Sequence, residues 1–114
     1  MDEDSATGDL VLHVQRRTGS TLLLIDGELD AATAPDLADL CRCVHAHGDR
    51  DVVIDLTATS FLDSSGLRAL VGARRLFGDG GGSLRLAHPS EPVMRLLEIT
   101  GLRDYFAIDE PTSG

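Results

Sequence analysis

The chain contains 114 residues, of which 42% are hydrophobic and 25% are charged, and its formal net charge at pH 7 is −9. This composition is typical of one globular domain and excludes a wholly disordered chain. The chain contains no lysine, so arginine supplies all of its Lys and Arg content, which excludes a P-loop lysine and a lysine Schiff base.

Charge and hydropathy also limit the partners that the chain can have. The acidic balance and the aromatic content of 4% argue against binding to nucleic acid, which needs clustered positive charge or stacking platforms. No apolar run approaches the roughly 20 residues of a membrane span, so we expect no membrane insertion. The acidic start, MDEDSATGD, lacks the basic-then-apolar order of a secretory signal, and we therefore expect a cytoplasmic location.

The first half of the chain predicts two strands and a helix. Residues 1–9 and 110–114 are polar, and we expect them to be flexible tails around a domain that spans 10–109. Two apolar runs joined by a Gly-Ser turn, LVLHVQ and TLLLIDGEL, predict an antiparallel pair of strands. Apolar residues at helical spacing then predict a helix that Thr33 caps and Gly48 ends.

The second half of the chain alternates strand and helix. VVIDL predicts a buried strand, and a helix over about 64–76 leads through the glycine-rich loop 78–82 into the strand LRLA. Ser90 caps a third predicted helix, and YFAI closes as a last strand. The elements predict an α/β fold: a single domain with a small mixed, mostly parallel β-sheet and helices packed on it, in the order β-β-α-β-α-β-α-β.

The stretch FLDSSGL begins the second helix with more polar groups than a helix start needs. Asp63 suffices as the N-cap, and Leu62 and Leu67 then occupy the two positions of a hydrophobic staple. Phe61 and Leu62 either contact a partner or serve within the domain, Leu62 as the staple alone and Phe61 in the core, and for Phe61 we favour the core.

The surplus consists of two serines and a glycine. Ser64 and Ser65 are left as first-turn residues, and Gly66 costs roughly 1 kcal/mol relative to alanine in a helix. Either close backbone approach by a partner or a functional constraint requires the glycine, or the serines are ordinary first-turn residues and the glycine is incidental.

Three motifs in a fixed order resemble one family. VVIDLTATSFLDSSGLRALVGA closely resembles the STAS domain of anti-sigma factor antagonists, with its D-S-S-G-L motif at a helix start. GELDAATAP and GGSLRLAHPSEPVMRLLEITGL resemble the family's second motif and third strand-helix unit, so the likeness covers about residues 10–108. The family often adds a final helix, for which EPTSG is too short.

The resemblance implies a role for each matching residue. Ser64 is the residue that a partner kinase would phosphorylate, and Asp30 is the acidic residue beside that site. The residues implied to contact the partner are Asp30, Thr33, Leu62, Asp63, Ser65, Gly66 and Leu67.

The same resemblance implies a regulator without enzymatic activity or cofactor. The unphosphorylated protein would bind an anti-sigma factor serine/threonine kinase and release a sigma factor, phosphorylation at Ser64 would switch binding off, and a serine phosphatase would reverse it. We expect a monomer when the protein is not bound to its partner. The alternative is a non-switching STAS module that serves as a subunit of a transport or stress-signalling assembly.

Other sites are weaker predictions. Cys41, Cys43, His45 and His47 alternate, but on a helix they form two pairs on different sides, short of the four ligands of a structural zinc site, so we expect no metal. A hydrolase would need the G-x-S-x-G motif, which is missing. The glycines of 78–82 lack G-x-G-x-x-G and precede a strand, which disfavours a phosphate-binding loop.

Overall fold

The computed structural model describes residues 3–7 and 10–109, and within them it contains one seven-stranded sheet and three α-helices. The described helices are α1 (Ala34–His47), α2 (Ser64–Asp79) and α3 (Glu91–Ile99), followed by a short 3-10 helix at Arg103–Tyr105. The described strands are β1 (Glu3–Thr7), β2 (Leu10–Arg17), β3 (Ser20–Leu29), β4 (Asp51–Asp55), β5 (Thr59–Leu62), β6 (Ser83–Ala87) and β7 (Ala107–Asp109).

The sheet is mixed, as the sequence predicts. Its strands lie in the order β1-β2-β3-β4-β6-β7, and β5 pairs with the end of β3. The first three strands are antiparallel neighbours, and every other pairing is parallel. Parallel strands need crossover connections, and here the helices supply them.

Two strands were not predicted. Residues 3–7 form β1, which pairs with β2 from Glu3 opposite Val14 to Thr7 opposite Leu10, so the expectation of a tail is wrong for this segment. The short strand β5 is the second, and its four-residue sequence TSFL is too short to give a periodic signal. Residues 110–114, also expected to be a tail, lie outside the described residues.

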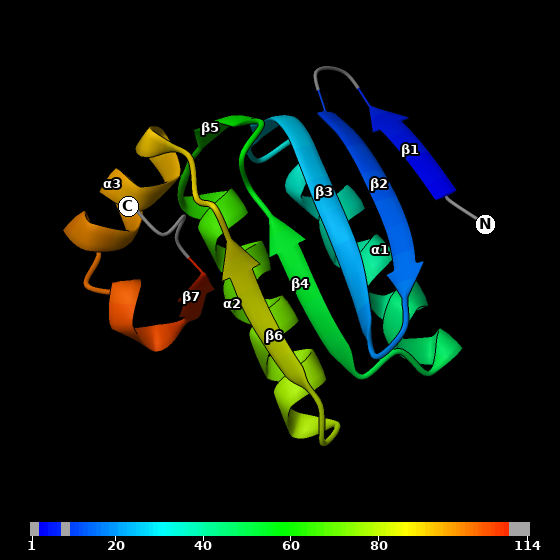
Figure 1. Ribbon diagram of the computed structural model, residues 1–114. Coiled ribbons are helices and arrows are strands. Elements are labelled where there is room, and N and C mark those ends of the chain that lie inside the picture. The colour runs from blue at the N-terminus through cyan, green and yellow to red at the C-terminus, as the bar shows by residue number, and fades with distance from the viewer. Residues whose placement is uncertain (1–2, 8–9, 110–114) are drawn as a thin grey trace, which may run out of the picture.

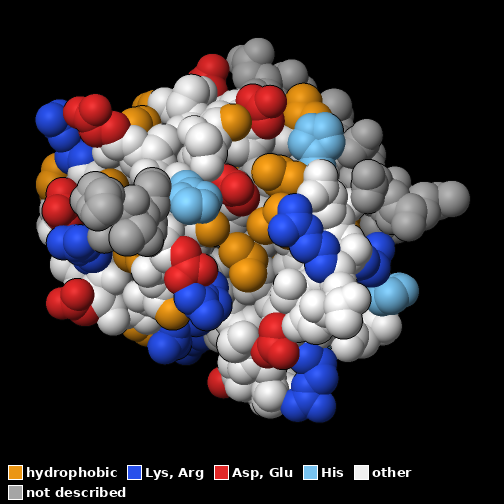
Figure 2. Space-filling view, viewed as in Figure 1, with side chains coloured by type: hydrophobic (Ala, Val, Ile, Leu, Met, Phe, Trp, Pro, Cys, Tyr) orange, Lys and Arg blue, Asp and Glu red, His pale blue; other side chains and the backbone are white. Residues whose placement is uncertain are grey.

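The core lies between the sheet and the helices. Figure 1 shows α1 and α2 side by side behind the sheet, with α3 beside its edge near β5. Alternate residues of the strands face these helices and are buried, among them Leu12, Leu23, Ile54 and Leu86. No described helix crosses the front face, where Figure 2 shows hydrophobic side chains gathered near the centre.

Two helix boundaries differ from the prediction in detail. Helix α2 continues beyond Leu76 through Gly78 and Asp79, because Phe77, only 1% exposed, anchors its last turn in the core. Ser90 stands at the N-cap of α3 without capping it, because its hydroxyl donates to the backbone oxygen of Thr59. That hydrogen bond ties α3 to β5.

Helix α2 begins in close contact with the end of β3. A Cβ atom at Gly66 would lie 2.5 Å from the backbone oxygen of Leu29 and 2.6 Å from Cδ1 of Leu62. Real Cβ atoms do not approach neighbours this closely, so only glycine fits without displacement of the helix. The packing of α2 on the sheet therefore explains the glycine in its first turn.

We expect the Gly66→Ala variant to be about 1–3 kcal/mol less stable than the wild type, because its methyl group overlaps backbone and core atoms. The matched control is Gly72→Ala in the same helix, where a Cβ atom meets nothing within 4 Å. That variant should gain about 0.5–1 kcal/mol from helix propensity. Urea unfolding measures both, and equal shifts in the same direction would contradict the packing argument.

Candidate functional site

The start of α2 is capped by Asp63, as predicted. The Asp63 Oδ1 atom accepts hydrogen bonds from the backbone N–H groups of Ser65, at 2.9 Å, and Gly66, at 3.0 Å. The Asp63 backbone oxygen accepts the first helical bond from the N–H of Leu67 at 2.9 Å. The carboxylate thus satisfies two of the N–H groups that a helix N-terminus leaves without partners.

The two serines of the motif differ in exposure. Ser64 is exposed, Ser65 is half-buried, and neither hydroxyl forms a hydrogen bond with another described residue. Because the cap is supplied by Asp63, the Ser64 hydroxyl has no structural task in the helix. It is accessible at the first helical position.

Three predicted contact residues lie inside the domain. Leu62 and Leu67 are each 6% exposed and belong to the core, as expected of a hydrophobic staple, and Gly66 is buried against Leu29. They fix the start of α2, and their side chains are not available at the surface. Their predicted role in contacting a partner is untested.

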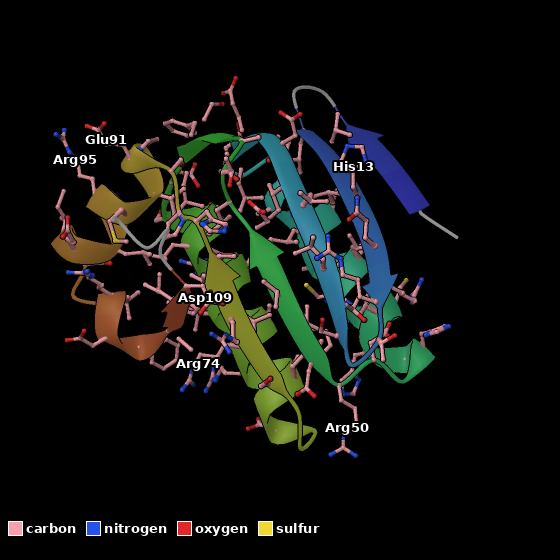
Figure 3. The ribbon with its side chains drawn as sticks, in the orientation of Figure 1. His13, Arg50, Arg74, Glu91, Arg95 and Asp109 are labelled. Carbon is pink, nitrogen blue, oxygen red and sulfur yellow. The ribbon has the colours of Figure 1, made fainter. Side chains whose placement is uncertain are left out.

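Phe61 was predicted to lie in the core, and this is wrong. Its side chain is 45% exposed, and with Ile99, which is 74% exposed, it lines a groove of about 370 Å³ between β5 and α3. Strand β5 buries residues 59 and 62 and leaves both 60 and 61 exposed, which departs from strict alternation. Figure 3 shows Glu91 and Arg95, which also line this groove, projecting from α3.

The second predicted motif forms a closed turn between β3 and α1. Asp30 Oδ1 accepts hydrogen bonds from the N–H groups of Ala32, at 3.0 Å, and Thr33, at 3.1 Å. The buried Thr33 hydroxyl donates to the backbone oxygen of Glu28 at 2.8 Å and accepts from the N–H of Asp30 at 2.9 Å. Thr33 precedes α1 but does not cap it with its side chain, because the hydroxyl holds this turn instead.

The sheet brings the two motifs together. Strands β3 and β5 are parallel, with Leu29 opposite Leu62, so Asp30 and Asp63 leave the same edge of the sheet one residue later. The Asp63 N–H also donates to the Leu29 oxygen at 3.3 Å. Carboxyl ends of neighbouring parallel strands are a common place for binding sites. The structure thus places Asp30 and Asp63 at the same edge of the sheet, and the role of Asp30 beside the serine motif stays a prediction.

A groove between α1 and α2 begins at Ser65, and the sequence prediction missed it. It has a volume of about 520 Å³, and small residues such as Ala38 and Gly72 form its apolar lining. Arg42 from α1 and Arg68 from α2 lie on its border. Small residues recur on one face of each helix, which is a weak signal because the same pattern also allows close helix packing.

The cysteine and histidine residues of α1 do not form a metal site in this structure's described part. Cys41 is buried and Cys43 is exposed, while the His45 ring packs edge-on against Phe77 with centroids 5.7 Å apart. Among residues 3–7 and 10–109, no cluster of three or more histidine, cysteine or acidic side chains is placed to hold a metal. Burial raises the pKa of Cys41 to about 12, which the nearby positive charge of Arg42 only partly offsets.

The arrangement defines a class of protein: a small mixed α/β domain with an exposed serine beside the cap of its second helix. The STAS domain family model matches residues 11–113, and the chain belongs to this family. The helices of the described region include none that is both long and apolar enough to cross a membrane.

The similar proteins with names are anti-sigma factor antagonists. The chain is 34% identical over 88 residues to the anti-sigma-B factor antagonists of Staphylococcus aureus and Staphylococcus epidermidis, covering 77% of this chain and 82% of theirs. The crystal structure of an anti-sigma factor antagonist from Mycobacterium paratuberculosis superposes with a TM-score of 0.82 at 30% identity, covering 95% of this chain and 91% of that one.

A more distant solved structure shares the fold. The anti-sigma factor antagonist SpoIIAA in its unphosphorylated form has a TM-score of 0.74 at 21% identity, covering 90% of this chain and 89% of that one. The Bacillus SpoIIAA structure in the phosphorylated form has a TM-score of 0.70 at 19% identity, covering 90% and 92%.

The raised pKa of Cys41 predicts a loss of stability in alkali. An unfolded thiol releases its proton near its ordinary value of 9.0, whereas the folded thiol holds its proton to about pH 12. The unfolded state therefore binds fewer protons between these values, and the free energy of unfolding should fall as pH rises through them. Urea unfolding at increasing pH should show a shallower fall for Cys41→Ala than for the wild type. The control Cys43→Ala, which changes an exposed thiol, should follow the wild type.

Proposed function

We propose that this protein is an anti-sigma factor antagonist that binds an anti-sigma factor serine kinase and is released when the kinase phosphorylates Ser64. The names of the relatives support the first part, because antagonists of an anti-sigma factor occur at 34% and 30% identity over most of the chain. The accessible Ser64 hydroxyl, next to a cap that does not use it, carries the second part.

The geometry suits a modification that leaves the fold intact. Ser64 is exposed at the first turn of α2, and no described hydrogen bond would be lost when its hydroxyl is esterified. A phosphate adds about −1.5 to −2 charges, which the positive end of the helix dipole tolerates. In the first turn of α2 the core contacts are made by Gly66 and Leu67, which are buried, and not by Ser64.

A bound partner would meet that charge directly. The segment from Phe61 to Ser65 connects two grooves, one lined by Phe61 and Ile99 and the other lying between α1 and α2. We propose that these grooves flank the kinase-binding surface and that Ser64 stands between them. Phosphate beside the Asp63 carboxylate would repel acidic groups of the partner and would keep water at an otherwise apolar interface.

The proposal gives Asp30, Thr33 and the buried residues distinct tasks. Asp30 is half-buried at the same sheet edge as Asp63 and can contact the partner, while Thr33 holds the turn that positions it. Leu62, Gly66 and Leu67 act from within the core, by fixing the angle at which α2 presents Ser64. A serine phosphatase would return the protein to its binding form.

Protein purified from its native host should carry a single phosphate on Ser64 in part of the population. Intact-mass measurement followed by peptide mapping identifies the site, and a Ser64→Ala variant is the control. The neighbouring Ser65→Ala variant should still be modified, because Ser65 is half-buried and Ser64 is exposed. An unmodified Ser64 in a protein that still copurifies with a partner would favour the non-switching STAS module.

Ser64→Asp should fold like the wild type and bind the copurifying kinase at least about tenfold more weakly, because it places a fixed charge in the interface. Isothermal titration measures the dissociation constant. The matched control is Thr18→Asp, which adds the same charge in the exposed turn at the opposite end of β3. Equal affinities for the two variants would refute the switch.

A further inference from the structure

A cation would add to the stabilisation of the proposed phosphate, because three N–H groups of the helix start already have partners. Asp63 accepts the N–H groups of Ser65 and Gly66, and the N–H of Leu67 is bound to the Asp63 backbone oxygen. A phosphate on Ser64 therefore cannot use these donors while the cap is intact. It would also stand next to the Asp63 carboxylate, which carries the same sign of charge.

Arg68 is the cation best placed in sequence to bind this phosphate. It lies four positions after Ser64 in α2, and residues at this spacing share one face of a helix. Long side chains of helices lean toward the N-terminus, so a guanidinium at position 68 can reach the turn that contains Ser64. Both residues are exposed, which leaves room for a phosphate between them.

Arg68 is also uncommitted in the unphosphorylated protein. Within the described residues it forms no ion pair or hydrogen bond, although the chain carries a net charge of −9 and offers many carboxylates. Arg74, on the same helix, stacks over the Tyr105 ring at 4.1 Å. Carboxylates pair with most of the other arginines that have partners in the described part, namely Arg16, Arg42, Arg85 and Arg103.

We propose, building on the proposed function, that Arg68 binds the phosphate of phosphorylated Ser64 and that this contact withdraws its charge from the α1–α2 groove. In the unphosphorylated protein Arg68 stands on the border of that groove, together with Arg42. Arg42 is paired with Asp39, so Arg68 is the border cation that a carboxylate of the partner can bind. Phosphorylation then adds negative charge and removes the neighbouring positive one, and both changes disfavour an acidic partner segment.

The contact can be tested without the kinase, in protein that carries genetically encoded phosphoserine at position 64. Phosphorus NMR titration follows the second ionisation of the phosphate near about pH 6. A guanidinium within contact favours the dianion and lowers this pKa, so Arg68→Gln should raise it by about 0.3 units. In about 1 M salt the difference should disappear.

The matched control is Arg75→Gln, which removes the same charge from an exposed position of the same helix. It lies about 10 Å farther along the helix than Arg68 and should leave the phosphate pKa unchanged. Equal shifts for Arg68→Gln and Arg75→Gln, or no shift in either, would overturn the proposal. Both arginines are exposed, so neither substitution removes core packing.

The outcome separates this inference from the proposed function, because the phosphate is introduced during translation. A shift specific to Arg68 supports the contact even when native protein carries no phosphate, which would overturn only the kinase switch. Phosphorylation of Ser64 in native protein, with no shift specific to Arg68, would support the switch and overturn the contact.

Discussion

The contact between Gly66 and the end of β3 is the constraint on which the site depends. Because Gly66 has no side chain, the first turn of α2 lies directly against the Leu29 oxygen. The N–H of Asp63 donates to the same oxygen, so strand β3 also fixes the residue that caps the helix. Asp30 directly follows Leu29, the last residue of β3, and is held by its own turn. A side chain at position 66 would move the helix start away from the strand end and separate the two motifs.

The sequence predicted those parts of the fold whose cause is local. Alternating or continuous apolar runs predicted β2, β3, β4 and β6, and helical spacing with caps and glycine stops predicted all three helices. Strand β1 was not predicted, because its polar sequence EDSAT gives no apolar pattern. As an edge strand it is held by backbone pairing with β2. Strand β5 is too short to show a period, and α2 runs on to Asp79 because tertiary burial of Phe77 outweighs the glycines around it.

At the candidate site, too, the sequence predicted the features with a local cause and missed those that depend on distant residues. Capping by Asp63 is an interaction within four residues, and the sequence predicted it correctly. The backbone that Gly66 contacts belongs to Leu29, more than thirty positions earlier in the chain, so the local pattern suggested a partner, a functional constraint or an incidental glycine and missed the packing within the domain. Phe61 was misplaced because its burial depends on the register of β5 against β3, which contains a shift between Gly27 and Glu28. The α1–α2 groove is a property of two packed helices and has no counterpart in either one alone.

At the helix start, Asp63 caps the helix, and the Ser64 hydroxyl does not take part in the cap. If Ser64 were the cap, its hydroxyl would hold an N–H group, and a phosphate there would have to break the cap. With Asp63 in that position, the proposed phosphorylation of the Ser64 hydroxyl would leave the hydrogen bonds of the first turn in place. The proposed phosphate would then find the N–H groups of Ser65, Gly66 and Leu67 already engaged, which favours contacts with side chains on the exposed face of α2. Surface charge there can vary without a cost to the core, because the residues that hold the helix start, Leu62, Gly66 and Leu67, are buried.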